Sequence, residues 1–173
     1  MVSNDLSSSV EIFVSCRDLK NLDTFSKSDP IVKIYMQNEK TKQWVLIGET
    51  ERVMNNLNPN FQRSINVVYF FEKHQVLKFD VLDDDGKNSF DTVGWAQMSM
   101  GDVMGARAQT KMVDLQAKEG GKRGRIIVRA ESIQASNIEC HWQIQGENLG
   151  NKSGLPCCPG IVPVHFNIER SSE

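Results

Sequence analysis

The chain has 173 residues, which is enough for one domain of common size with an appendage. Hydrophobic residues make up 39% of it and charged residues 24%, so the composition is that of an ordinary soluble globular protein. The net charge of −2 excludes a general electrostatic match for nucleic acid.

Residues 1–9 are polar and lack both the basic and the apolar stretch of a signal peptide. No apolar run approaches the roughly 20 residues that a membrane-spanning helix needs. We therefore expect a cytoplasmic protein whose four cysteines are free thiols rather than a disulfide framework.

From residue 10 onward, short runs of β-branched and aromatic residues are separated by turn residues at intervals of about 10 to 15 positions. Several runs alternate with period two, and in one of them Leu77, Phe79 and Val81 share a face. The predicted strands are residues 10–17, 31–36, 44–49, 64–70, 76–82, 92–99, 111–115 and 125–131. One short helical turn is expected at residues 100–108. This pattern predicts an all-β fold, an eight-stranded antiparallel β-sandwich.

Two groups of aspartates stand out in the turns of this pattern. Asp23 and Asp29 lie between the first two predicted strands, and Asp83, Asp85 and Asp91 follow the fifth. Carboxylates this dense repel one another unless a cation lies among them. Oxygen ligands in flexible loops suit a large, hard cation, so the sequence predicts a Ca²⁺ site.

The order of the strands predicts that both groups lie at one end of the sandwich. If consecutive strands alternate in direction, the connections after the first, third and fifth strands emerge at the same end. These connections are residues 18–30, 50–63 and 83–91. The first and third carry all five aspartates, which predicts a single acidic rim. The segment Asp83-Asp84-Asp85-Gly86 alone is more often a solvated hairpin turn, so the prediction depends on the joint spacing.

These residues resemble the C2 domain over about residues 9–132. The resemblance is carried by Leu19-Lys20-Asn21-Leu22-Asp23, Ser28-Asp29-Pro30, Asn58-Pro59-Asn60-Phe61, Asp83-x-Asp85 and Asp91-x-x-Gly94. More narrowly, Ser15-Cys16-Arg17-Asp18-Leu19 is similar to the first C2 domain of a copine. Copines carry two C2 domains and an integrin-like A domain, and they bind phospholipid in response to calcium. The resemblance implies the permuted, type II strand order, in which the last strand is residues 125–131.

The resemblance also implies roles for individual residues. Asp29, Asp83 and Asp85 would be the central ligands of two calcium ions, and Asp23 and Asp91 would complete the cluster. Further ligands would come from Thr24, Asp84 and Asn88. Phe25 and Phe90 are candidates for shallow insertion into a membrane, and Lys27 and Lys87 for contact with lipid headgroups. Packing of Phe90 beneath its own loop is an equal alternative. A second basic strip, Lys33, Lys40 and Lys42, is more often an ordinary solvated face.

The segment 133–173 differs from the rest of the chain. Residues 144–153 align with residues 14–23, so this segment resembles the first strand of a second C2 domain. No Ser-Asp-Pro follows, and Gly and Pro interrupt the remainder. We expect a C2 domain at residues 1–132 and a truncated, largely irregular start of a second one at 133–173.

The expected function is a calcium-dependent phospholipid-binding module that recruits the protein to anionic membranes. It would move from the cytoplasm to the plasma membrane or other membranes with calcium, and the nucleus is a further expected location. The alternative is a protein-interaction C2 module with little calcium dependence, which binds partners through a sheet face. No Ser/His/Asp set, phosphate-binding glycine loop or HExxH-type motif is present, so we do not expect an enzyme.

Overall fold

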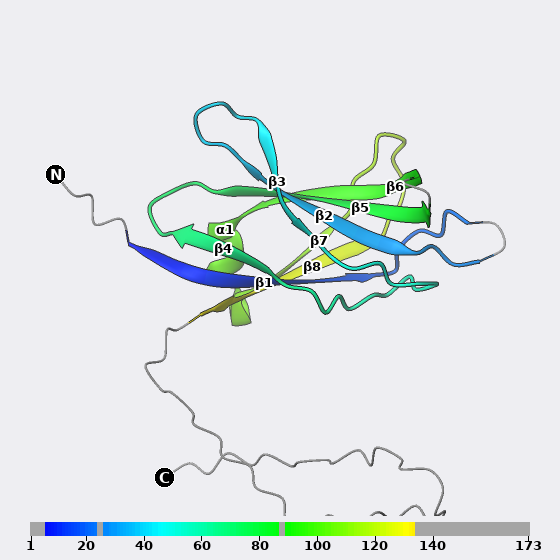
Figure 1. Ribbon diagram of the computed structural model, residues 1–173, viewed down its shortest axis with the longest axis horizontal. Helices are drawn as coiled ribbons and strands as arrows, with labels where there is room; N and C mark the ends of the chain where they lie inside the picture. Colours follow the sequence, from blue (N-terminus) through cyan, green and yellow to red (C-terminus); the bar gives the residue numbers. More distant parts are fainter. Residues whose placement is uncertain (1–5, 24–25, 87–88, 134–173) are drawn as a thin grey trace, which may run out of the picture. The chain divides into compact units, whose positions relative to one another are not determined.

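The computed structural model describes residues 6–23, 26–86 and 89–133, and these form two antiparallel four-stranded sheets (Figure 1). The strands are β1 (Ser7–Arg17), β2 (Pro30–Gln37), β3 (Trp44–Glu49), β4 (Ile65–Phe70), β5 (Val76–Gly86), β6 (Ser89–Ser99), β7 (Thr110–Asp114) and β8 (Arg125–Ser132). A short helix α1 (Met100–Met104) and a 3-10 turn η1 (Arg107–Gln109) connect β6 to β7. The predicted sandwich and its helical turn are confirmed.

The order of the strands places the last strand beside the first. One sheet has the order β4-β1-β8-β7 and the other β3-β2-β5-β6. Because β8 pairs antiparallel with both β1 and β7, the final strand completes the sheet that the first strand begins. This arrangement agrees with the permuted order that the sequence resemblance implied.

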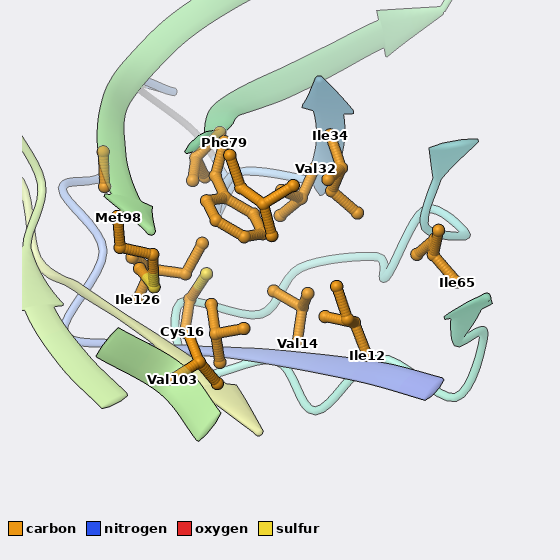
Figure 2. Packing of buried hydrophobic residues seen from close by; sticks show 14 of the residues in the cluster. Ile12, Val14, Cys16, Val32, Ile34, Ile65, Phe79, Met98, Val103 and Ile126 are labelled. Carbon is orange, nitrogen blue, oxygen red and sulfur yellow. The ribbon is translucent and has the colours of Figure 1, made fainter. Parts of the chain in front are cut away.

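The core lies between the two sheets and follows the period-two pattern. On β1 the inward residues are Val10, Ile12, Val14 and Cys16, and all are buried. Figure 2 shows Ile12 and Val14 facing Phe79 across the core. Burial raises the pKa of the Cys16 thiol to about 12, so this cysteine is an unreactive free thiol.

The structure corrects the predicted connection at residues 83–91. Strand β5 continues to Gly86 and β6 begins at Ser89, so most of this segment is paired. The ladder sets Asp83 opposite Asp91 and Asp84 opposite Phe90, with irregularities on both sides of this pairing. Aspartate is depleted in strands, so the sequence pattern ended the first of these strands too early and began the second too late. Asp83, Asp85 and Asp91 therefore lie on two paired strands rather than in an open connection.

One edge of the first sheet is closed by a side chain. Two outward backbone groups of β4 bond to Gln75: the Phe70 N–H donates to Gln75 Oε1, and Gln75 Nε2 donates to the Val68 carbonyl, both at 2.8 Å. The strand is uncharged from Ile65 to Phe70, and Val68 is exposed. An open edge of this composition would be a template for pairing with another chain, so Gln75 blocks strand addition.

Replacing Gln75 by leucine should open this edge. We expect a loss of stability of about 1–2 kcal/mol from the two hydrogen bonds, together with concentration-dependent self-association. Thermal unfolding and light scattering measure the two effects. Gln43→Leu is the matched control, because Gln43 is exposed in the connection between β2 and β3. Equal scattering from the two variants would contradict a blocking role for Gln75.

Candidate metal centre

Three connections meet at one end of the sandwich, as strand parity predicted. They follow β1, β3 and β5, and Figure 1 shows them together at the right-hand end. The Asn55 N–H donates to Asp29 Oδ1 at 2.7 Å and links the second connection to the first. The Asp84 N–H donates to the Asp29 carbonyl at 3.1 Å and links the first to the hairpin. Asp29 therefore joins all three segments.

Side-chain hydrogen bonds shape the first connection. Asn21 Nδ2 donates to the carbonyls of Asp23 and Ser26, at 2.9 and 2.8 Å. Asn21 Oδ1 accepts from the Ser28 N–H at 2.9 Å, and the buried Ser28 Oγ accepts from the Leu22 N–H at 3.0 Å. These bonds fold the backbone around Asn21. The Asp23 carboxylate is thereby presented to the hairpin, with Ser26 Oγ donating to its Oδ2 at 2.7 Å.

Three of the predicted ligands form a compact group. Carboxylate oxygens of Asp23, Asp83 and Asp85 lie within 4.8 Å of one another. Asp83 is only 1% exposed. Its Oδ1 accepts from the Asp29 N–H at 2.6 Å, but its Oδ2 is buried without a hydrogen-bond partner among the described residues. A buried charged oxygen without a partner is costly, so this atom fits a cation ligand.

The other two predicted ligands adjoin this group. Asp29 donates its N–H to Asp83 and accepts at Oδ1 from Asn55. Asp91 is the ladder partner of Asp83 and is exposed. All five aspartates are thus gathered at the rim, with Asp23, Asp83 and Asp85 the most closely spaced. A cluster of hard carboxylate oxygens is the donor set that Ca²⁺ prefers.

The charges of this cluster act on one another. Desolvation and the negative charges of neighbouring aspartates raise the pKa of the Asp85 carboxyl above its ordinary value. The neighbours are Asp83, Asp91, Asp23 and Asp84. Because each repels the charged form of Asp85, the rim holds unfavourable electrostatic energy that a bound cation would relieve.

Of the remaining predicted site residues, some lie outside the described part of the chain and only some of the others face the rim. Thr24, Phe25, Lys87 and Asn88 lie outside the described residues. Lys27 is exposed at the rim, and its N–H donates to Asn55 Oδ1 at 3.3 Å. The side chain of Asp84 turns aside: its Oδ1 accepts from the Gly86 N–H at 2.9 Å, and its Oδ2 lies 3.8 Å from Arg52.

Phe90 lies on the aspartate hairpin, opposite Asp84, whereas the members of the basic strip are separated from one another. Phe90 is 36% exposed, and Lys33 Nζ lies 4.4 Å from the centroid of its ring. Lys40 and Lys42 are exposed in the connection between β2 and β3. That connection emerges at the end opposite the aspartates, whereas Lys33 lies within β2 and contacts Phe90.

We did not predict from the sequence that the connection between β3 and β4 contributes residues to the rim. Met54 is 64% exposed, directly before Asn55, whose N–H bonds to Asp29. An exposed apolar residue therefore directly precedes a residue whose backbone contacts a rim carboxylate. Two signals were available: Met54 is an apolar residue in a connection that parity places at the rim, and the Asn residues after it are typical of turns.

A family model for the C2 domain matches residues 9–115. The chain belongs to the C2 domain family. It is also similar to two copines of Dictyostelium discoideum. It is 35% identical to Copine-E over 168 residues, which cover 94% of this chain and 28% of the relative. It is 34% identical to Copine-A over 157 residues, which cover 90% of this chain and 26% of that relative. The chain thus spans less than a third of the length of these relatives.

Solved structures support the fold of this C2 domain. A C2 domain of plant Extended Synaptotagmin 1 matches with a TM-score of 0.57 at 19% identity, over 73% of this chain and 96% of that one. A calcium-bound structure of two C2 domains of Extended-Synaptotagmin 2 matches with a TM-score of 0.55 at 22% identity, over 72% of this chain and 45% of that one. The predicted resemblance to the C2 domain, and its similarity to copines, are confirmed. Within the described residues, no helix is long and apolar enough to cross a membrane.

The repulsion at Asp85 leads to a prediction about the calcium-free C2 domain. Its raised folded pKa means that the charged form destabilises the fold. This penalty is absent at pH values below the ordinary carboxyl pKa and is fully present above the raised one. We expect the Asp85→Asn variant to melt at a higher temperature than the wild type in chelator at neutral pH. In acid, where Asp85 is protonated, the two melting temperatures should be the same. Thermal unfolding of both proteins across this pH range measures it. A lower melting temperature for the variant at neutral pH would contradict the repulsion.

Proposed function

We propose that this C2 domain binds calcium at the aspartate rim and, once loaded, associates with anionic phospholipid membranes. One observation carries the proposal: the buried Oδ2 of Asp83 has no hydrogen-bond partner among the described residues and lies within a group of carboxylates. Membership of the C2 family and similarity to copines support a non-catalytic binding module that responds to calcium and lipid.

The described residues supply part of a calcium coordination sphere. Asp83 would offer its free Oδ2, with Asp23 and Asp85 on either side. Asp29 and Asp91 would contribute from the adjacent backbone segments. Calcium takes six to eight oxygen ligands. Positions that the protein leaves open would be filled by water or by a lipid phosphate, so calcium and lipid would strengthen each other's binding.

Charge reversal would switch the rim between repulsion and attraction. Without calcium, the carboxylates of the rim repel an anionic lipid surface. Each bound calcium ion adds two positive charges, and a favourable charge near an anionic leaflet contributes about 1 kcal/mol. Because hydrogen bonds of Asn21, Ser28 and Asn55 already hold the loops, the switch requires little conformational change.

Met54 would be the apolar contact with the membrane. Met54 is exposed and directly precedes Asn55, which bonds to Asp29, whereas Phe90 lies against the ammonium of Lys33. A methionine at the rim could enter the headgroup layer once calcium has removed the repulsion. Lys27 is exposed on the neighbouring connection and would face the headgroups.

A protein-interaction role remains the second candidate, because the outer face of the β3-β2-β5-β6 sheet carries a groove. The groove is lined by Trp44 on β3 and Trp95 on β6, with Lys78 and Leu82 of β5 between them. A partner held there would need no calcium. This alternative predicts binding that is indifferent to substitutions at the rim.

The first experiment compares wild type with Asp85→Asn in co-sedimentation with phosphatidylserine vesicles, in calcium and in chelator. We expect calcium-dependent pelleting of the wild type and a loss of affinity of about tenfold or more in the variant, from lost ligation and lost charge compensation. Glu39→Gln is the control, since it removes one negative charge in the connection at the opposite end. Pelleting that ignores both chelator and Asp85→Asn would defeat the calcium mechanism.

A second substitution tests the membrane contact. Met54→Asp should weaken calcium-dependent vesicle binding by at least about tenfold, because it removes an apolar side chain and adds a charge that the leaflet repels. Calcium binding in the absence of lipid, measured by calorimetry, should not be weakened, because the added carboxylate attracts the cation. Leu6→Asp is the control, since Leu6 is as exposed as Met54 and lies at the other end of the domain. Equal loss in both variants would show a nonspecific effect of charge.

A further inference from the structure

A fourth connection reaches the rim beside the aspartates. Residues 115–124 join β7 to β8, and Figure 1 shows this connection at the same end as the other three. The Lys20 N–H donates to the Arg123 carbonyl at 3.2 Å and ties it to the first connection. Whereas the first and third connections are acidic, this one carries Lys118, Lys122 and Arg123, with Arg125 at the start of β8.

The base of this connection is packed tightly against the first. Gly124 has φ +98°, and a Cβ placed on it would lie 2.7 Å from the carbonyl oxygen of Asp18. Only glycine permits that approach. A groove of about 670 Å³ lies beside this contact, lined by Lys122, Arg123 and Arg125 together with Asp18, Asp114 and Leu115. Backbone contact therefore holds the two connections together at the edge of the groove.

One of the residues that line the groove is a buried arginine. Arg123 is only 5% exposed. Within the described part of the chain, its guanidinium donates to the Gly120 carbonyl at 3.4 Å and to Glu119 Oε2 at 3.0 Å. A guanidinium has five N–H donors, so donors remain for a ligand. The carboxylate partner is weakly held, because the side chain of Glu119 is 85% exposed and such pairs contribute little.

The charges in the groove determine which kind of ligand could take the place of the Glu119 carboxylate on Arg123. Arg125 is paired with Asp18, and Asp114 adds a further negative charge to the lining. A ligand must therefore outcompete one carboxylate and tolerate another nearby. A phosphomonoester carries close to two negative charges and three acceptor oxygens, which match the forked donors of arginine better than a single carboxylate does. Lys122 would supply the second positive charge.

We infer that this groove is a phosphomonoester site that works without calcium, with Arg123 as its anchor and Glu119 as a displaceable internal competitor. The site itself is independent of the proposed calcium function. Its assignment to a phosphorylated lipid headgroup rests on that function, because the rim then faces the membrane. A soluble phosphomonoester would use the same chemistry.

The test measures binding of inositol trisphosphate to the full chain in chelator by calorimetry. Arg123→Gln should weaken binding about tenfold and Lys122→Ala severalfold, whereas Glu119→Gln should strengthen it severalfold, because it removes the competing charge. Lys42→Ala is the control at the opposite end and should change nothing. Asp85→Asn should also leave this binding intact, which separates the site from the calcium rim.

Two arms identify the source of the ligand. The protein should bind, in chelator, to vesicles of phosphatidylcholine that contain a phosphatidylinositol bisphosphate. The variants should rank in the same order of affinity as for the soluble probe, and inositol trisphosphate should displace the protein from the vesicles. Binding of the soluble probe without vesicle binding would support the site and assign it to a free phosphomonoester. If thermal unfolding shows that Arg123→Gln does not fold, the substitutions of the two exposed residues, Glu119→Gln and Lys122→Ala, test the inference. Unchanged affinity in both Glu119→Gln and Lys122→Ala, or loss through Lys42→Ala, would overturn the inference.

Discussion

The hydrogen bond from the Asp29 N–H to Asp83 Oδ1, at 2.6 Å, is the contact on which the rim depends. On β5 the inward residues Leu77, Phe79 and Val81 belong to the hydrophobic core, and Asp83 continues the same face. The row of core side chains thus ends in a carboxylate. The bond to Asp29 satisfies one oxygen and holds the first connection, while the second oxygen has no hydrogen-bond partner among the described residues. The hydrophobic core and the candidate metal centre thus occupy successive inward positions of one strand.

Much of this arrangement could be predicted from the sequence. The alternation of Leu77, Phe79 and Val81 identifies β5, and strand parity alone brings Asp23, Asp29 and the hairpin aspartates to one end. These inferences succeed because period and direction are properties of the chain itself. The extent of the hairpin was not predictable in this way, since its residues have low strand propensity and are held by pairing with β2 and β6.

Other features depend on contacts between distant segments, which no local pattern encodes. The bond between Asn55 and Asp29 joins residues 26 positions apart, and it alone reveals that the residue after Met54 contacts a rim carboxylate. Gln75 closes the edge of β4 through a side chain whose identity carries no strand signal. Burial of Arg123 likewise depends on how the connection after β7 folds back toward Asp18.

The position of β8 has a consequence for attachment. Ser132 pairs with Val10, and the Ile133 N–H donates to the Ser9 carbonyl at 2.8 Å. The chain therefore enters and leaves the sandwich at one pole, and the aspartates occupy the other. A label, surface linker or neighbouring domain joined at either end of the sandwich would start from the pole away from the aspartates. Both attachment points of the sandwich are therefore close together, at the pole opposite the aspartates.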